Sequence, residues 1–341
     1  MFGVMVASEC APVAQAGGLG DVVFGLSREL EWPGNAVEIV PKYDCLRYDR
    51  IYGLTLDYED LWVPWYRGAI HCTVFFGLVD GRKCFFIEPH SHDSFFDRGH
   101  LYRSSDDVER FAFFSRAALE FMLKSGKRPE IIHCHDWQTA LVPVLLYEIY
   151  QQIGMGDQRV CFTAHNFGHQ GITGESILWA TGLCNPGRFF VRERLQDDFN
   201  PAALNLMKGG IVYSNFVTTV SPGHAWEVSY SDQGRGLGHT LYTHRDKFGG
   251  VLNGVDYEAW NPEVDPWIAQ RYGPDSIEDK YVNKRALRDR FMLRDEYKPI
   301  VTYVGRLDGQ KGVHLIHHAI FYALEEGAQF VLLGSSPDPA I

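Results

Sequence analysis

Short apolar runs alternate with longer amphipathic stretches along most of the chain. The short runs have the length and the β-branched or aromatic content of buried strands, and the longer stretches repeat apolar residues with a helical period. The expected strands are residues 2–7, 37–40, 70–76, 83–87, 131–135, 160–164 and 216–220, and the expected helices are about residues 20–30, 106–124 and 139–150. Strands that run into helices in this way predict an α/β fold with a doubly wound, mainly parallel sheet.

Polar residues follow directly after four of these strands. They form the sequences SECAP, HDWQ, HNFGHQG and SPGHA. Because ligands of open parallel sheets bind beyond the carboxyl ends of the strands, the four polar ends predict one shared cleft.

A change of pattern near residue 255 predicts a domain boundary. We expect a first domain at 1–255 and an interdomain connection at 256–298, which is rich in Pro, Trp and charged residues. A strand, a helix and a second strand then fill residues 299–341. A lone βαβ unit leaves an open apolar edge, so we expect an incomplete second α/β domain there.

The charge balance argues against nucleic-acid and membrane partners. With 32 Lys and Arg against 43 Asp and Glu, the formal net charge is −11, and no overall field attracts phosphate or anionic lipid. No apolar run reaches the ~18 residues that a spanning helix needs, and the opening segment lacks the basic flank of a signal peptide. The number of cysteines is odd, at 7, which is typical of reduced core thiols, and we expect a cytoplasmic protein.

A glycine-rich loop follows the first expected strand. Gln15, Gly17, Gly18 and Asp21 lie where strand gives way to helix, and the backbone N–H groups and helix dipole at such a place favour an anion. A diphosphate is the expected ligand, and a plain strand-to-helix turn is the alternative. The third glycine of the dinucleotide fingerprint is missing, which weakens the case for a nicotinamide-dependent oxidoreductase.

The segment 133–138 places two histidines and a carboxylate at a strand end. His133 and His135 project to the same side of a strand, which makes zinc an alternative, but a third protein ligand at the usual spacing is absent. Asp136 is the better candidate, as a carboxylate that binds sugar hydroxyls or helix N–H groups. A simple helix cap is the alternative for Asp136.

Three further segments carry candidate ligand groups. His165 and Asn166 lie beside glycines after another strand, a combination that suits a polyol. Asn253 begins an Asn-Gly pair, which is also typical of a tight turn. Arg306 and Lys311 lie where a strand of the second domain meets a helix, and they predict a phosphate site or, alternatively, solvated surface charges.

Taken together, these motifs resemble the ADP-glucose-dependent glycogen and starch synthases, a family of retaining glycosyltransferases, and especially their starch synthase III/IV-like branch. The resemblance runs over nearly the whole chain. It rests on the glycine loop at 15–21, PKYDC at 41–45, FFDRGHLY at 95–102, DDVERFAFFSRAALE at 106–120, HCHDWQTALVP at 133–143, AHNFGHQG at 164–171, TTVSPGHAWEV at 218–228, VLNGVDYEAWNP at 251–262 and VGRLDGQKG at 304–312.

The resemblance implies a GT-B architecture with no cofactor and no metal. An α-1,4-glucan acceptor, as in glycogen or starch, is expected mainly on the amino-terminal domain, and the ADP-glucose donor between the domains. By position, the resemblance implies a diphosphate loop at Gly17 and Gly18, a contact of His165 with the donor glucose, a sugar cleft lined by Asp136 and Asn166, phosphate binding by Arg306 and Lys311, and pocket contributions from Asp21 and Asn253.

Two departures from the family pattern support a second hypothesis. The family has a lysine where this chain has Gln15, and the family's carboxyl-terminal half lies beyond Ile341. Loss of one charge-assisted hydrogen bond at Gln15 corresponds to ~1.5–3 kcal/mol, or roughly 10- to 100-fold in rate or affinity. We expect the absence of the carboxyl-terminal half to reduce activity more than Gln15 does. The alternative is a noncatalytic glucan-binding starch-synthase-like protein in granule initiation, located in the plastid stroma if the source is a plant or alga.

Overall fold

The computed structural model describes residues 2–30, 36–336, 338 and 340–341 of the chain. Contacts between residues divide the chain into two compact units, Met1–Gly254 and Val255–Ile341. Among the described residues, none of the helices combines the length and the apolar character that crossing a bilayer requires.

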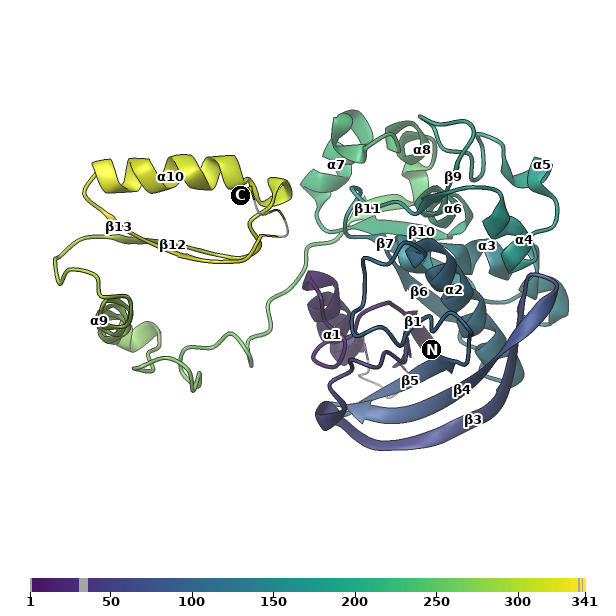
Figure 1. The fold of residues 1–341 in the computed structure, drawn as a ribbon, viewed down its shortest axis with the longest axis horizontal. Helices are drawn as coiled ribbons and strands as arrows, with labels where there is room; N and C mark the ends of the chain where they lie inside the picture. Colours follow the sequence, from purple (N-terminus) through teal and green to yellow (C-terminus); the bar gives the residue numbers. More distant parts are fainter. Residues whose placement is uncertain (1, 31–35, 337, 339) are drawn as a thin grey trace. The chain divides into compact units, whose positions relative to one another are not determined.

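The first unit is built on a nine-stranded sheet with the order β11-β10-β7-β6-β1-β2-β5-β4-β3 (Figure 1). The strands from β11 to β5 pair parallel with one another, and β4 pairs antiparallel with both β5 and β3 at one edge. The nine strands are β1 Gly3–Val6, β2 Ala36–Pro41, β3 Ile51–Trp65, β4 Gly68–Val79, β5 Arg82–Pro89, β6 Ile131–His135, β7 Arg159–Ala164, β10 Phe216–Thr219 and β11 Phe248–Gly250. The predicted mainly parallel α/β sheet is confirmed.

Among its described residues, this unit also contains eight α-helices and a small hairpin. The hairpin pairs β8 Ile172–Thr173 with β9 Leu204–Asn205. The helices are α1 Gly18–Leu30, α2 Asp107–Lys124, α3 Leu141–Glu148, α4 Ser176–Thr181, α5 Pro186–Phe189, α6 Leu206–Tyr213, α7 Pro222–Tyr230 and α8 Gly238–Thr243. The predicted helices near 20–30, 106–124 and 139–150 are α1, α2 and α3, the last of them shortened by flanking 3-10 turns.

Helix α2 is the centre of the core, and it is buried without interruption from Arg110 to Met122. The Arg110 guanidinium bonds Asp107 and the carbonyl oxygens of Phe95 (3.1 Å) and Leu101. A buried charge is tolerated only when it is paired and hydrogen-bonded, as it is here. Arg110 thereby holds the loop that leads to Tyr102, which reaches the candidate site.

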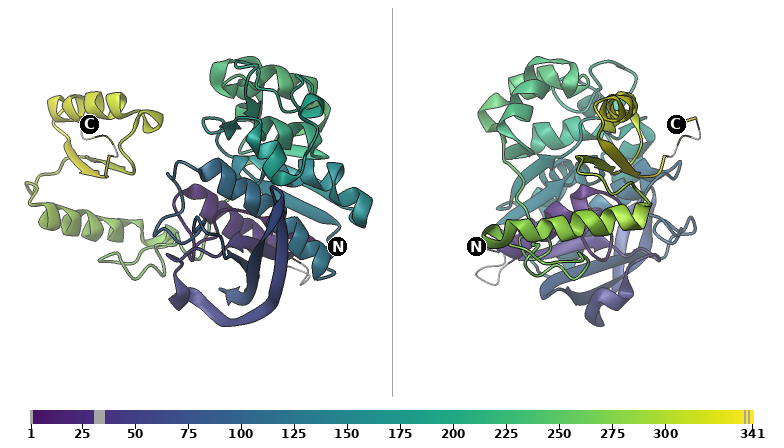
Figure 2. Two further views of the ribbon diagram at one scale, coloured as in Figure 1. Left: turned by 45° about the vertical axis from the view of Figure 1, so that its right-hand side comes forward. Right: turned by 90° about the vertical axis from the view of Figure 1, so that its left-hand side faces the viewer.

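Strand β3, at the antiparallel edge, is the longest element of the first unit that the sequence pattern does not predict, whereas β4 contains the strand expected at 70–76. Figure 2 shows the long β3–β4 ribbon curving along one side of the sheet. Strand β3 is exposed over most of its length and carries charged residues at 57, 59 and 60. An edge strand of this kind lacks the apolar alternation by which a strand is normally recognised.

The second unit contains the predicted strand–helix–strand order. Strands β12 Ile300–Val304 and β13 Gln329–Leu333 are parallel, and α10 Val313–Glu325 connects them. Helix α9 Lys280–Phe291 precedes them, in a segment expected to be a connection. Its sequence KYVNKRALRDRF is too polar to show an apolar stripe, so the helix was not predicted from the sequence.

Candidate functional site

The carboxyl ends of β1, β6, β7 and β10 lie next to one another at one edge of the parallel sheet. These four strands are consecutive neighbours in the order β10-β7-β6-β1, and each pair is parallel. The four polar sequences that follow them therefore share one edge, and the shared cleft expected there stays a prediction. We call this group of loops the strand-end edge; it comprises residues 7–21, 136–138, 165–171 and 220–224.

Glu9 organises the first of these loops. Its carboxylate is almost fully buried, and Oε2 accepts hydrogen bonds from the backbone N–H groups of Ala16 (2.8 Å) and Gly17 (3.0 Å). Oε1 accepts a hydrogen bond from the Tyr102 hydroxyl at 2.7 Å. Burial, and then the charge of Glu9, raises the pKa of Tyr102 well above its usual range, which keeps this hydroxyl a donor. The backbone N–H groups of Ala16 and Gly17 are therefore already occupied by the Glu9 carboxylate and are not available to a ligand.

Sequence reasoning did not single out Glu9. The signal was present, because Glu9 is the one carboxylate in SECAP, directly after β1. What the sequence cannot show is that this carboxylate turns back onto the glycine loop instead of facing solvent.

The exposed part of the glycine loop is open to a ligand. A Cβ atom added at Gly17 or Gly18 would meet nothing within 4 Å, so the backbone is accessible at both positions. Gln15 Nε2 donates to Asp21 Oδ1 at 2.9 Å across the turn. Helix α1 begins at Gly18, and the first N–H groups of a helix have no partner within it. The free donors for an anion are therefore those at the start of α1, beyond Gly17.

Asp136 holds the loop that follows the neighbouring strand. Its Oδ1 accepts hydrogen bonds from the backbone N–H groups of His165 (2.6 Å) and Asn166 (3.3 Å). The Asp136 side chain makes no cap bond to the 3-10 turn that follows it, so the helix-cap alternative is wrong. The Asp136 carboxylate instead holds the loop that follows β7, by binding the backbone N–H groups of His165 and Asn166, the two residues predicted to contact sugar.

The backbone of Asp136 is strained. It has φ 57° and ψ −179°, a region that residues other than glycine rarely adopt. Such a conformation costs about 1–3 kcal/mol and persists only where the surroundings impose it, which is typical of functional sites. Burial raises the pKa of Asp136, whereas His165 and the two backbone N–H groups act to lower it.

Three imidazole rings stack beside Asp136. The centroids of His133 and His135 are 4.2 Å apart, and those of His135 and His165 are 5.4 Å apart. His133 Nε2 lies 2.7 Å from Thr163 Oγ1, and His135 Nδ1 lies 3.1 Å from His165 Nε2. Burial lowers the pKa of His133 to about 4 and holds that of His135 well below its usual value. Both rings are therefore neutral near pH 7, and each bonds a protein group.

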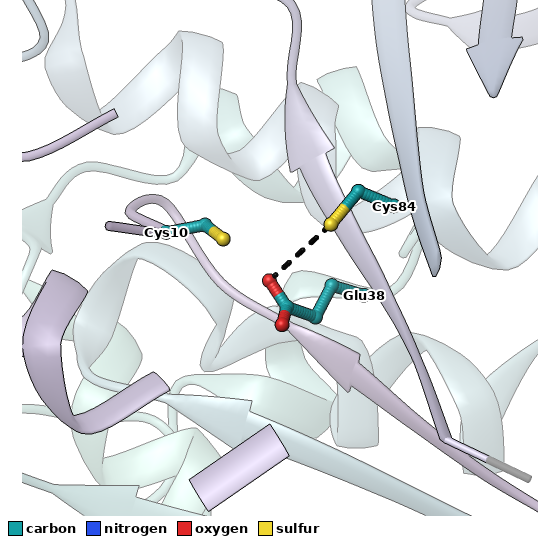
Figure 3. A group of neighbouring side chains, drawn as sticks. All are labelled: Cys10, Glu38 and Cys84. Atoms are coloured by element: carbon teal, nitrogen blue, oxygen red, sulfur yellow. Dashed lines mark hydrogen bonds between the residues drawn. The ribbon is translucent and has the colours of Figure 1, made fainter. Parts of the chain in front are cut away.

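Within the described residues, the stacked histidines are not a group of three side chains with metal-ligand spacing. Over the described part of the chain, the one group of three side chains with metal-ligand spacing is Cys10, Glu38 and Cys84 (Figure 3). Figure 3 shows these buried side chains pointing toward one another, with Cys84 Sγ 3.7 Å from Glu38 Oε2.

Arg82 already neutralises this cysteine–glutamate group. Its Nη1 donates to Glu38 Oε1 at 2.5 Å and to Cys10 Sγ at 3.6 Å. The hydrogen bond with Cys10, and then burial, raises the pKa of Cys84 well above its usual range, so this thiol stays protonated. A cation here would meet a guanidinium and a neutral thiol, which points to a structural role in joining β2, β5 and the loop after β1.

The loop after β7 uses several of its polar groups internally. Asn166 Oδ1 accepts a hydrogen bond from the Gly168 N–H at 2.8 Å. The buried Gln170 side chain donates to the carbonyl oxygens of Phe167 (2.9 Å) and Arg235 (3.1 Å). His165 and Asn166 remain partly exposed and His169 is exposed, so these side chains, and not that of Gln170, are open to a ligand.

The three remaining predicted residues, Asn253, Arg306 and Lys311, do not belong to the loops of the strand-end edge. Asn253 is exposed, and neither Asn253 nor Gly254 has a positive φ, so the tight-turn alternative is wrong. Arg306 and Lys311 both lie in the second unit, after β12. The Arg306 side chain is 54% exposed, and its Nη1 lies 3.7 Å from Asp308 Oδ2. Asp308 Oδ1 accepts a hydrogen bond from the Lys311 backbone N–H at 3.0 Å.

Comparison with known proteins identifies the family to which this chain belongs. The model of the starch synthase catalytic domain matches residues 4–243. The chain is 64% identical to glycogen synthase 1 of Trichormus variabilis over 342 aligned residues, which cover 100% of this chain and 70% of that protein. The chain belongs to the glycogen and starch synthase family. Its members are retaining glycosyltransferases, and the predicted family and enzyme class are confirmed.

Structural comparison supports the same family. The catalytic domain of starch synthase IV from Arabidopsis thaliana, solved bound to ADP and acarbose, superposes with a TM-score of 0.94 at 44% identity and covers 99% of this chain and 69% of that one. The probable starch synthase 4 of the same plant is 46% identical over 100% of this chain and 33% of its own length. The expected GT-B fold is confirmed by this likeness.

Proposed function

We propose that this chain binds ADP-glucose and an α-1,4-glucan and transfers glucose to the non-reducing end of the glucan with retained configuration. The proposal is supported chiefly by its 44% identity and TM-score of 0.94 with a starch synthase IV domain whose structure contains ADP and acarbose. The strand-end edge supplies polar groups of the kind that a sugar and a diphosphate need.

Each candidate residue has a proposed role. The start of α1, at Gly18, offers N–H donors to the diphosphate, next to the accessible Gly17. His165 contacts the donor glucose, and Asn166 lines the sugar cleft. Asp136 contributes mainly by fixing the backbone of these two residues, because its Oδ1 is engaged by their N–H groups.

The remaining assignments follow the family positions. Asp21 and Asn253 contribute to the pocket, and Arg306 and Lys311 bind the phosphates, where positive charge stabilises the departing ADP. No metal and no cofactor takes part. A nucleic-acid partner is not expected, and a cytoplasmic or plastid location stays a prediction. We assign the acceptor to the domain at 1–255 and part of the nucleotide-sugar side to 299–341.

The second candidate is a noncatalytic glucan-binding role, and Gln15 favours it. Where the family has an ammonium group, Gln15 has an amide, and this amide bonds Asp21. An amide gives a weaker hydrogen bond to phosphate than an ammonium group does.

One assay separates the two functions. Labelled ADP-glucose and glycogen are incubated with the 341-residue chain, with its Gln15→Lys variant and with a fusion to the part of the Trichormus protein that the chain does not cover. Label in the glucan supports catalysis. Retention on a glucan column without label transfer by any of the three proteins supports the binding role and refutes the enzymatic one.

A further inference from the structure

His135 is a fully buried residue that the proposed reaction does not use directly. It lies at the end of β6, and its ring is 0% exposed between His133 and His165. Its backbone N–H donates to Thr139 Oγ1 at 2.7 Å, so the backbone position is fixed. The His135 ring contacts the strand-end edge through one polar atom, Nδ1, which lies 3.1 Å from His165 Nε2.

The contact between the two imidazoles has a direction, since one nitrogen donates and the other accepts. If His135 Nδ1 carries the proton, it donates to His165 Nε2. If His165 Nε2 carries the proton, it donates to His135 Nδ1, and the neutral His135 ring then carries its own proton on Nε2.

The surroundings of His135 Nε2 decide between these states. This atom is buried and has no hydrogen-bond partner among the described residues. A buried N–H group without an acceptor is the rarer and costlier defect, whereas an unpaired acceptor is more often tolerated. The proton of His135 therefore belongs on Nδ1. Burial also keeps the pKa of His135 well below its usual value, which excludes a ring protonated at both nitrogens near pH 7.

The state of His165 follows from that of His135. A neutral His165 that accepts at Nε2 carries its proton on Nδ1. No hydrogen bond of this Nδ1 occurs within the described residues, and Nδ1 is absent from the buried polar atoms that lack a partner. His165 is partly exposed, so Nδ1–H is open to a ligand.

We propose that His135 is a positioning residue that fixes His165 in the Nδ1–H tautomer, so that His165 presents a hydrogen-bond donor to a sugar hydroxyl oxygen. The identity of the ligand rests on the proposed function, and the tautomer rests on the geometry alone. A ring held as a donor selects a ligand with an acceptor at that place and excludes a donor-only group such as an ammonium.

The direct test is nuclear magnetic resonance of the 341-residue chain labelled with ¹⁵N-histidine. Two-bond ¹H–¹⁵N correlations distinguish the two neutral tautomers, and the His165→Gln variant identifies the His165 signals by their loss. The expected pattern for His165 is a protonated Nδ1 and an unprotonated Nε2. A protonated Nε2 on His165 in the unaltered chain overturns the proposal.

The His135→Phe variant tests the cause. Phenylalanine keeps a ring of similar size but offers neither nitrogen, so the His165 signals are expected to move toward a mixture of tautomers. An unchanged Nδ1–H pattern in a folded His135→Phe protein shows that His135 does not set the tautomer. If His135→Phe does not fold, the spectrum of the unaltered chain still decides.

Kinetics give a second measurement. In the assay with ADP-glucose, His135→Phe is expected to lower kcat/KM roughly 5- to 10-fold, the equivalent of one hydrogen bond between neutral groups. If the unaltered chain transfers no glucose, the result argues against the proposed function. The resonance pattern still confirms or overturns the tautomer in that case. The two failures are therefore distinguishable.

Discussion

Replacing Glu9 tests whether the glycine loop is held from inside the protein. In Glu9→Gln the side chain keeps its shape, so the amide oxygen still accepts from Ala16 and Gly17 while its NH₂ faces the Tyr102 oxygen. The change removes the negative charge from three hydrogen bonds. In Glu9→Ala the two N–H groups and the hydroxyl lose their partner.

The structure sets the size of the effect. A hydrogen bond to a charged group contributes about 1.5–3 kcal/mol and one between neutral groups about 0.5–1.5 kcal/mol. With two bonds to the loop, Glu9→Gln is expected to weaken loop closure by about 2 kcal/mol. Glu9→Ala is expected to cost about 3–5 kcal/mol, because it also leaves buried groups unpaired.

The assay is hydrogen–deuterium exchange of the backbone at Ala16 and Gly17. A loss of about 2 kcal/mol in local opening corresponds to roughly 30-fold faster exchange. The matched control is Glu29→Gln on α1, whose side chain is 76% exposed and lies 3.5 Å from Arg28, because exposed pairs contribute little. Unchanged exchange at residues 16 and 17 in both Glu9 variants refutes the reasoning.

Three further predictions concern other parts of the first unit. Gln15→Lys is expected to raise glucose transfer roughly 10- to 100-fold through a charge-assisted bond to phosphate, and an equal or lower rate in the labelled assay contradicts this. Arg82→Met is expected to lower the free energy of unfolding by about 3–5 kcal/mol, because it leaves Glu38 as an unpaired buried charge, and Arg82→Met combined with Glu38→Met is expected to recover most of that loss in thermal melts. The pKa of His133 is lowered to about 4, so between pH ~6.5 and 4 the unfolded chain binds a proton at this residue and the folded chain does not. The free energy of unfolding is therefore expected to fall as the pH drops through this window, by at most ~3 kcal/mol. His133→Phe is expected to reduce the fall in melting temperature over that window without abolishing it, because the pKa of His135 is also lowered. An unchanged pH dependence counts against the assignment.

Much of the parallel sheet is predictable from the sequence, because its strands are buried on both faces. Strands β1, β6 and β7 are short apolar runs that end in polar residues, and the same pattern gives both their position and the edge they share. Strand β3 and helix α9 escape prediction because their stability comes from pairing and packing, not from a continuous apolar pattern.

The candidate site is predictable only as a set of residue types. The position of polar residues after strands identifies Asp136 and His165 as candidates, but it does not show which protein groups their side chains bind. The structure turns Asp136 toward the backbone of the next loop and places the unpredicted Glu9 under the glycine loop. Such contacts depend on φ and ψ at single residues, as the φ of 57° at Asp136 illustrates, and no composition or spacing specifies them.

A crystal structure of the chain with ADP and a maltooligosaccharide tests the central claim most directly. The account predicts that the ligands contact the start of α1 at Gly18 and the side chain of His165, at the carboxyl ends of β1 and β7. Ordered ligands bound on another surface, with this edge occupied only by solvent, would contradict it.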